Sequence, residues 1–256
     1  MRLSKRSPIL RPLLKLPGQT VDEDLQEFVD DQFLAPLLVL AIIGAMCIVE
    51  WTGYLRSAPR NPWFYSYWFI GAAVVIAVHW RSQWRRALAL KLGRDGERAV
   101  AEYLNIRLEP VPRVFHGVPI EGGIADHVVI CAHGIFVIET KARTLPSRGE
   151  PVVHVSDTSL RVSGFKPDRD PITQVQGYVD GLNRILAELS ITKILARGIV
   201  LFPSWKIIDD RRQMNEIWAI EPKDLPDRFS KEPVVFTPEE VLSITRKLAS
   251  YIRPTS

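Results

Sequence analysis

The stretch IADHVVICAHGIFVIETKAR, residues 124–143, contains the residues that decide the fold. Two β-rich runs, 124–130 and 135–141, are separated by the turn-forming residues AHG, and this pattern predicts an antiparallel hairpin. The second run is apolar until it ends on Glu139 and, two residues later, Lys141. A strand that reads as buried and ends on a carboxylate and an ammonium raises the question of what these charges do.

The hairpin brings a second carboxylate to this pair. Side chains alternate along a strand, so Glu139 and Lys141 share one face. A two-residue turn at 132–133 puts Asp126 opposite Glu139, and a turn at 133–134 puts Asp126 opposite Lys141. Both registers place Asp126 on the same face, with opposed Cβ atoms roughly 5 Å apart. A three-residue loop would break this arrangement.

Two carboxylates and a lysine on one face fit metal-assisted phosphodiester hydrolysis. Neighbouring carboxylates repel each other unless a cation compensates, and Mg²⁺ prefers hard oxygen ligands. Such an ion lowers the pKa of a bound water and stabilises charge on a phosphodiester. Lys141 would orient the water or stabilise the developing negative charge.

Two alternatives compete with this site. Glu-x-Lys is a common tripeptide, and charges at a strand end are usually only solvated. A nucleophile formed by Cys131 and His133 is a weaker alternative, because a turn histidine beside a strand cysteine is more often structural.

The chain also contains a second acid–lysine set. A proline stands between the glutamate and the lysine of this set, and its aspartates lie in the polar run DDRRQ, which is not typical of a strand. The set consists of Asp209, Asp210, Glu221 and Lys223.

The N-terminal third has the composition of a membrane anchor. Residues 33–49 are 17 residues without a charge, and residues 62–80 form a second uncharged run if His79 is neutral. A membrane helix needs roughly 20 mostly apolar residues, and both runs carry Trp or Tyr near an end. We therefore expect a two-helix hairpin at about 33–53 and 62–80. A cleaved signal peptide fits poorly, since the first run starts at residue 33; a buried hairpin in a soluble core is the other alternative.

Basic residues predict the orientation of this hairpin. Cations are frequent in 1–32 and in the linker 81–92, whereas the short connection between the spans has two arginines, Arg56 and Arg60. The positive-inside rule then places both termini in the cytoplasm, and we expect a bacterial inner membrane. The net charge of +4 alone selects no partner.

Residues 93–256 read as a mixed α/β or α+β domain. The periodicity predicts helices at 93–105, at 170–189 with Asp170 as N-cap, and at the C-terminus with Thr237 as N-cap. Strands are predicted in 111–120, in the hairpin above, in a second hairpin from residue 151, and at ARGIVLFP and EIWAI. This order favours a central sheet flanked by helices.

Three of these segments, in this order, resemble the NERD (nuclease-related) domain: GRDGERAVAEYL, the hairpin, and DPITQVQGYVDGL. The family pattern is a G-x-x-G-E helix, an IDHVVV…GIFVIETK hairpin and a later NP-x-x-Q helix. The resemblance covers about residues 93–205, and the hairpin is its specific part. It implies similarity to the PD-(D/E)XK nucleases, hence a restriction-endonuclease-like central mixed sheet flanked by helices and a Mg²⁺- or Mn²⁺-dependent phosphodiesterase.

The resemblance also implies roles for individual residues. Asp126 and Glu139 would hold the metal with the Thr140 carbonyl, and Glu97 would add a direct or indirect carboxylate. Lys141 would position water, and Gln174 would contact the scissile phosphate or orient the water. Both residues have an alternative explanation without a role in the site. Glu97 could be present because the helix dipole favours a glutamate near a helix N-terminus, and Gln174 could be a polar residue of the first helical turn that faces solvent.

The sequence departs from the family pattern in three places. Ala125 separates Ile124 from Asp126, Asp170 replaces the usual asparagine, and KARTLPSRGE lacks the usual Trp-Gly after the lysine. None of these removes a candidate ligand, but the last leaves substrate contacts open. The basic residues that flank the site would steer a nucleic-acid backbone or form a solvated surface; they are Arg94, Arg98, Arg143 and Arg148.

Three functions remain open from the sequence. The first is a membrane-anchored, metal-dependent nuclease that cleaves DNA or RNA on the cytoplasmic side. The second is a catalytically silent membrane protein whose NERD-like domain binds nucleic acid or a protein partner. The third is a scaffold in which the hairpin matters most. The complete acid–acid–lysine set favours the first, because carboxylates facing a phosphate without a metal would repel it.

Overall fold

A computed structural model describes residues 18–56, 61–107, 113–156, 160–162, 170–211 and 217–252. The chain divides into two compact units. One is Val21–Leu92, and the other combines Met1–Thr20 with Gly93–Ser256.

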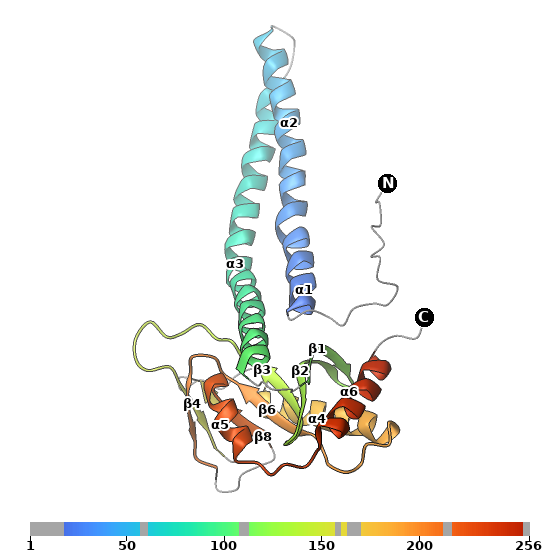
Figure 1. The fold of residues 1–256 in the computed structure, drawn as a ribbon. Helices are drawn as coiled ribbons and strands as arrows, with labels where there is room; N and C mark the ends of the chain where they lie inside the picture. Colours follow the sequence, from blue (N-terminus) through green and yellow to red (C-terminus); the bar gives the residue numbers. More distant parts are fainter. Residues whose placement is uncertain are drawn as a thin grey trace. The chain divides into compact units, whose positions relative to one another are not determined.

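The first unit is a pair of long helices that lie side by side (Figure 1). Helix α1 (Gln19–Val29) continues through a π-helical turn, η1 (Asp30–Leu34), into α2 (Ala35–Leu55). Helix α3 (Pro62–Arg107) has 46 residues. It therefore runs from the second apolar segment through the basic segment 81–92 into the helix predicted from residue 93, and the connection at 57–60 lies outside the described residues.

The apolar parts of these helices are exposed. By length and composition, both helices could cross a membrane, and none of either apolar window is buried. Polar contacts hold the pair together at two levels. Trp51 Nε1 donates to Ser66 Oγ at 3.0 Å, and His79 Nε2 hydrogen-bonds Gln32 Oε1 at 3.0 Å. The exposure argues against the core hairpin of a soluble protein, whose apolar face would be covered.

The second unit is built on a five-stranded mixed sheet, as the sequence predicts. Its order is β1-β2-β3-β6-β8. The first three strands are antiparallel, whereas β3, β6 and β8 are parallel. The strands are β1 (Arg113–Ile120), β2 (Gly123–Cys131), β3 (Gly134–Thr140), β6 (Arg197–Leu201) and β8 (Ile217–Ile220).

Helices cover both faces of this sheet (Figure 1). Helices α4 (Pro171–Glu188) and α6 (Pro238–Ile252) pack on the face that carries Val128, Ile130 and Val137. The C-terminal part of α3 and α5 (Leu225–Ser230) pack on the opposite face. Both predicted caps are confirmed. Asp170 accepts from Ile172 N at 3.1 Å, and Thr237 Oγ1 accepts from Glu240 N at 3.3 Å.

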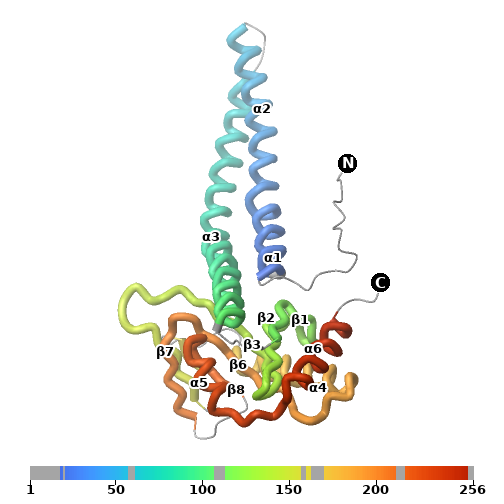
Figure 2. Tube along the Cα trace, in the orientation of Figure 1, coloured from blue at the N-terminus to red at the C-terminus, as the bar shows by residue number. Residues whose placement is uncertain are grey.

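A second, three-stranded sheet has the order β5-β4-β7, and Figure 2 labels its strand β7. Its strands are β4 (Val152–Val155), β5 (Leu160–Val162) and β7 (Lys206–Asp209), and a short 3₁₀ turn, η2 (Pro222–Asp224), follows β8. The pairing of β4 with β5 confirms the predicted second hairpin. Strand β7 corrects the sequence interpretation of DDRRQ, since Asp209 ends a strand. The strand was not predicted because its β-favouring part is only two residues long, Ile207 and Ile208.

Two histidines form a cross-strand pair in the main sheet. His116 and His127 are register partners on β1 and β2, and their Nδ1 atoms lie 2.9 Å apart. His127 has no exposed surface, and its Nε2 has no hydrogen-bond partner among the described residues. Burial, with His116 as a second cause, lowers the pKa of His127 to about 3.

Acid should therefore destabilise the wild type relative to a His127→Val variant. The pKa of His127 is lower in the folded than in the unfolded protein. The contribution of His127 to the free energy of unfolding is therefore present above about pH 6.5 and is lost as the pH falls below that value. Between about pH 6.5 and pH 5, the difference in unfolding free energy between the two proteins should change by about 2 kcal/mol. Pulse proteolysis of the sheet domain in urea measures it. The exposed His154, changed to Gln, should leave the wild-type pH dependence intact, and equal pH profiles for wild type and His127→Val would contradict the expectation.

Candidate active site at the end of β3

The β2–β3 hairpin has the first of the two predicted registers. Cys131 pairs with Gly134 and His127 with Ile138, so the turn consists of Ala132 and His133. Continued by one residue, this register sets Asp126 across from Glu139. The alternation of side chains along each strand then puts both carboxylates on the face that packs against α4.

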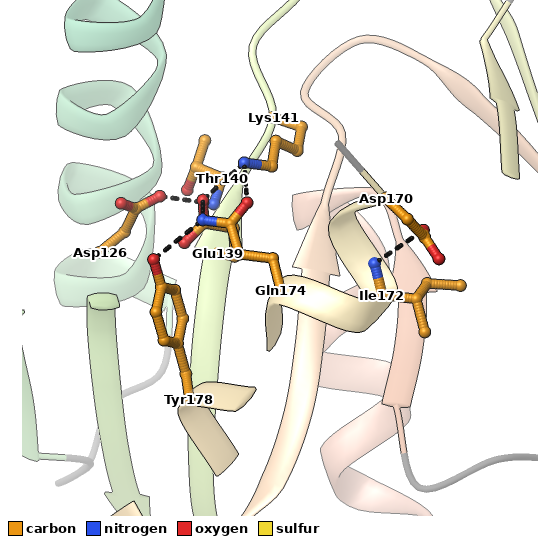
Figure 3. Close-up of polar contacts among 8 residues, drawn as sticks. All are labelled: Asp126, Glu139, Thr140, Lys141, Asp170, Ile172, Gln174 and Tyr178. Carbon is orange, nitrogen blue, oxygen red and sulfur yellow. Dashed lines mark hydrogen bonds and ion pairs between the residues drawn. The ribbon is translucent and has the colours of Figure 1, made fainter. Parts of the chain in front are cut away.

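Lys141 and Gln174 close around one oxygen of Glu139 (Figure 3). Lys141 Nζ lies 2.6 Å from Glu139 Oε1, and Gln174 Nε2 donates to the same oxygen at 2.9 Å. Gln174 Oε1 accepts from Lys141 Nζ at 2.9 Å. The amide orientation follows from chemistry, because an ammonium only donates and a carboxylate only accepts.

Asp126 is tied to the same strand end through the backbone. Its Oδ2 accepts from Thr140 N at 2.7 Å (Figure 3). The contact between these residues uses the Thr140 N–H, whereas the resemblance assigns a role to the Thr140 carbonyl. The Thr140 hydroxyl is buried without a hydrogen-bond partner in the described part of the chain. The hydrogen bond fixes the Asp126 carboxylate beside Glu139.

Glu97 reaches the site from α3. Its side chain is 6% exposed, and its Oε1 accepts from the backbone N–H of Gly18 at 2.9 Å. The preceding residue explains how the helix can approach β3 so closely, because a Cβ on Gly96 would lie 2.3 Å from the Cβ of Ala142. The glycine of the G-E pair thus makes room for the glutamate to approach the other carboxylates.

Substituting the two helix glycines should give opposite results. A Gly96→Ala variant should lose about 1–3 kcal/mol of unfolding free energy, because the new methyl overlaps Ala142 and both groups are rigid. Gly93→Ala is the matched control. Nothing lies within 4 Å of its added Cβ, so it should gain about 0.5–1 kcal/mol from helix propensity. Urea unfolding of the sheet domain measures both. Equal effects at the two positions would refute the close-packing argument.

Burial raises the pKa values of all three carboxylates, and neighbouring carboxylates add to the effect at Asp126 and Glu97. Burial, then the charge of Glu139 and of Glu97, hold the pKa of Asp126 well above its ordinary value. Burial raises the pKa of Glu139 against the opposing effect of Lys141. Burial also raises the pKa of Glu97, opposed by the Gly18 hydrogen bond and reinforced by the charge of Glu139. Three acidic groups therefore interact at one place, which typifies functional sites.

This set fits a hard divalent cation. Glu139 is 5% exposed, and its Oε2 is buried with no hydrogen-bond partner among the residues described. An ion is one of the partners that satisfies such a buried, unpartnered carboxylate oxygen. No complete group of three potential ligands exists in the described ranges. Mg²⁺ tolerates this, because it commonly binds through one or two carboxylates and keeps several waters. Asp126 and Glu139 would hold the ion.

The four predicted basic residues fall into two groups, since Arg94 and Arg98 both lie beside Gly18 whereas the other two follow β3. Arg94 pairs with the neighbouring Asp95 at 2.9 Å. Arg98 lies beside Gly18 and carries a charge that acts on Glu97. Arg143 and Arg148 are exposed in the segment after β3. Arg98 is thus the predicted cation whose charge is felt by a site carboxylate.

The second acid–lysine set lines a different pocket. This pocket has a volume of about 480 Å³, and Asp209, Glu221 and Lys223 are among its lining residues. Two of its carboxylates form ion pairs with cations of the same pocket. Asp209 binds Arg211, and Glu221 binds Lys223. Burial raises the pKa of Asp209, but the hydrogen bonds from Arg211 outweigh this and lower it. We therefore place the candidate site at Glu139, where the carboxylate pKa values are raised.

Tyr178 is a site residue that the sequence interpretation missed. Its hydroxyl accepts from Gln174 Nε2 at 2.9 Å, so it helps to fix the amide that bridges Glu139 and Lys141 (Figure 3). The signal was present, since residues four apart on a helix lie on one face. The contact of Gly18 with Glu97 joins positions 79 apart, and local spacing gives no sign of it.

Comparison with known proteins identifies the family of this domain. Residues 92–203 match the family model of the nuclease-related domain, NERD, which agrees with the resemblance predicted for 93–205. No curated protein and no solved structure matches the chain significantly. The match contains every carboxylate, lysine and glutamine of the cluster described above. The chain therefore contains a nuclease-related domain, at residues 92–203.

Proposed function

We propose that this protein is a membrane-anchored, divalent-metal-dependent nuclease that hydrolyses phosphodiester bonds of DNA or RNA. The observation that carries the proposal is the buried Glu139 Oε2, which has no partner in the described structure. It lies in a cluster of acidic groups with raised pKa values, and Lys141 lies 2.6 Å from the other oxygen. Burying charged groups without complete partners costs free energy, so this arrangement does not serve the stability of the fold.

The residues would share the work as follows. Asp126 and Glu139 hold Mg²⁺ or Mn²⁺, and Glu97 supplies a third carboxylate directly or through water. The ion, when bound, lowers the pKa of a water and stabilises the charge on the phosphodiester. Lys141 orients the attacking water or stabilises the negative charge in the transition state. Gln174 fixes Lys141 and contacts the phosphate, and Tyr178 orients Gln174.

The anchor would be a two-pass hairpin. Its support is the exposure of two apolar helices and the excess of basic residues on the flanks of both spans. In this arrangement residues 33–80 span a bacterial inner membrane, while the tail 1–32, the basic segment 81–92 and the nuclease domain 93–256 lie on the cytoplasmic side. Protease added to sealed inside-out vesicles should then digest the domain, whereas digestion only in right-side-out vesicles would reverse the orientation.

A cleavage assay tests the activity. The full chain in detergent is incubated with plasmid DNA, single-stranded DNA and RNA, each with Mg²⁺, with Mn²⁺ or with EDTA. We expect cleavage of at least one substrate with either metal and none with EDTA. Calorimetry under the same conditions measures binding of the metal alone, so a folded protein that binds no metal and cuts nothing would overturn the proposal.

One observation favours the second candidate function, a catalytically silent domain that binds nucleic acid or a protein. No three potential metal ligands converge completely within the described ranges, and Lys141 is held by Glu139 and Gln174. A silent domain would bind nucleic acid equally with Mg²⁺ and with EDTA. The nuclease should instead lose affinity in EDTA, because unscreened carboxylates repel a phosphate backbone.

A further inference from the structure

The helical unit contains a groove at the end of its second apolar segment. Its volume is about 840 Å³. The residues around it lie at the end of the uncharged run 62–80 and immediately after it and, on the other helix, just before α2. They combine aromatic rings with two arginines and are Phe33, Trp80, Arg81, Ser82, Trp84 and Arg85.

The aromatic wall of the groove is held in place by hydrogen bonds. Trp80 Nε1 donates to the backbone carbonyl of Gln32 at 3.1 Å, and the Gln32 side chain binds His79. The rings of Phe33 and Trp80 lie 5.8 Å apart, centre to centre. Phe33 also packs edge-on against Phe28, with ring centres 6.3 Å apart. The hydrogen bond of Trp80 and these ring contacts make the groove a built feature and not a gap between two loose helices.

The cations of the groove are positioned for an anion. Arg81 and Arg85 are four residues apart on α3, so they lie on one face of the helix and repel each other. Both are exposed, and neither forms an ion pair with any described residue. Asp30 and Asp31 of η1 precede Phe33 but do not line the groove. A phosphate between the two guanidinium groups would relieve the repulsion.

We propose that this groove binds the headgroup of an anionic phospholipid. The two arginines take the phosphate, and the rings of Phe33, Trp80 and Trp84 contact the glycerol and upper acyl chains. Trp84, 58% exposed, is a side chain that favours the interface between headgroups and hydrocarbon. The apolar wall selects an amphiphile over a free phosphate ion. The proposal rests on the membrane placement proposed above and is independent of catalysis.

The test compares lipid binding by two double variants of the full chain. The protein is reconstituted in nanodiscs of equimolar phosphatidylcholine and phosphatidylglycerol, and the lipid it retains is counted by native mass spectrometry. The wild type should retain phosphatidylglycerol preferentially. The variant Arg81→Gln/Arg85→Gln should bind phosphatidylglycerol with an apparent affinity about tenfold or more below that of the wild type. The control Arg86→Gln/Lys91→Gln removes the same charge from the same helix outside the groove and should keep the preference.

Three results would overturn the lipid site. Equal loss in both double variants would reduce it to general surface attraction, and unchanged binding in Arg81→Gln/Arg85→Gln would exclude the groove. A third result concerns the thermal stability of the detergent-solubilised chain. If inorganic phosphate alone stabilised it as much as phosphatidylglycerol does, the ligand would be a free anion and not a lipid. Carbonate extraction of vesicles separates the two proposals. If the lipid preference fails but all variants stay in the membrane after carbonate treatment, the anchor proposal still holds. If carbonate extracts the wild type from the membrane, the anchor itself is refuted.

Discussion

Replacing Glu139 by Gln or Lys141 by Met should lower metal-dependent cleavage roughly a thousandfold, because each change removes charge stabilisation inside a buried site. Glu139→Gln keeps the shape of the side chain but removes an ionised ligand. Lys141→Met keeps the length of the side chain and removes the ammonium that lies 2.6 Å from Glu139 Oε1. The measurement is the rate of substrate cleavage under single-turnover conditions at saturating Mg²⁺.

The second acid–lysine set supplies the matched control for this prediction. Glu221→Gln and Lys223→Met make the same chemical changes at a pair with the same spacing. That pair lines the 480 Å³ pocket, and its members bind each other. The control variants should cleave at the wild-type rate. If they lost activity while the Glu139 and Lys141 variants kept it, the active site would have been assigned to the wrong acid–lysine set.

The proximity of the main residues of the candidate site could be predicted because they belong to one hairpin. The period-two pattern of 124–141 puts Asp126, Glu139 and Lys141 on one face for either of the two registers considered. Gln174 required the resemblance to the family, since it comes from a helix 33 residues after Lys141. The helix N-cap at Asp170 was recognisable from local chemistry alone.

What the sequence could not predict depends on contacts between distant segments. The close approach of Gly96 to Ala142 and the hydrogen bond from Gly18 to Glu97 have no local signal. Strand β7 was missed for a related reason. It is a four-residue strand with Lys206 and Asp209 at its ends. Its two central isoleucines favour a strand but are too few to predict one, and the strand is stabilised by pairing with β4.

Neutralising Asp126 should stabilise the domain and at the same time abolish its activity. Asp126→Asn can still accept the hydrogen bond from Thr140 N, but it no longer repels Glu139 and Glu97. Burial and these charges raise the folded pKa of Asp126 above its unfolded value. Its stabilising contribution is therefore complete below the unfolded pKa and is lost as pH rises through the folded pKa. With EDTA near neutral pH, the variant should exceed the wild type by on the order of 1 kcal/mol, and the difference should close on acidification.

Magnesium should reverse this order of stability. An ion that binds the folded wild type stabilises it by mass action, whereas Asp126→Asn has lost one of two carboxylate ligands and should respond little. Pulse proteolysis of the sheet domain in urea, with Mg²⁺ or EDTA, measures both effects. Asp180→Asn, an exposed change on α4, should respond to Mg²⁺ as the wild type does. Equal stabilisation of wild type and Asp126→Asn by Mg²⁺ would contradict the assignment of Asp126 as a ligand. A less stable Asp126→Asn protein in EDTA would contradict the repulsion, because removing a charge that repels its neighbours cannot destabilise the fold through those charges.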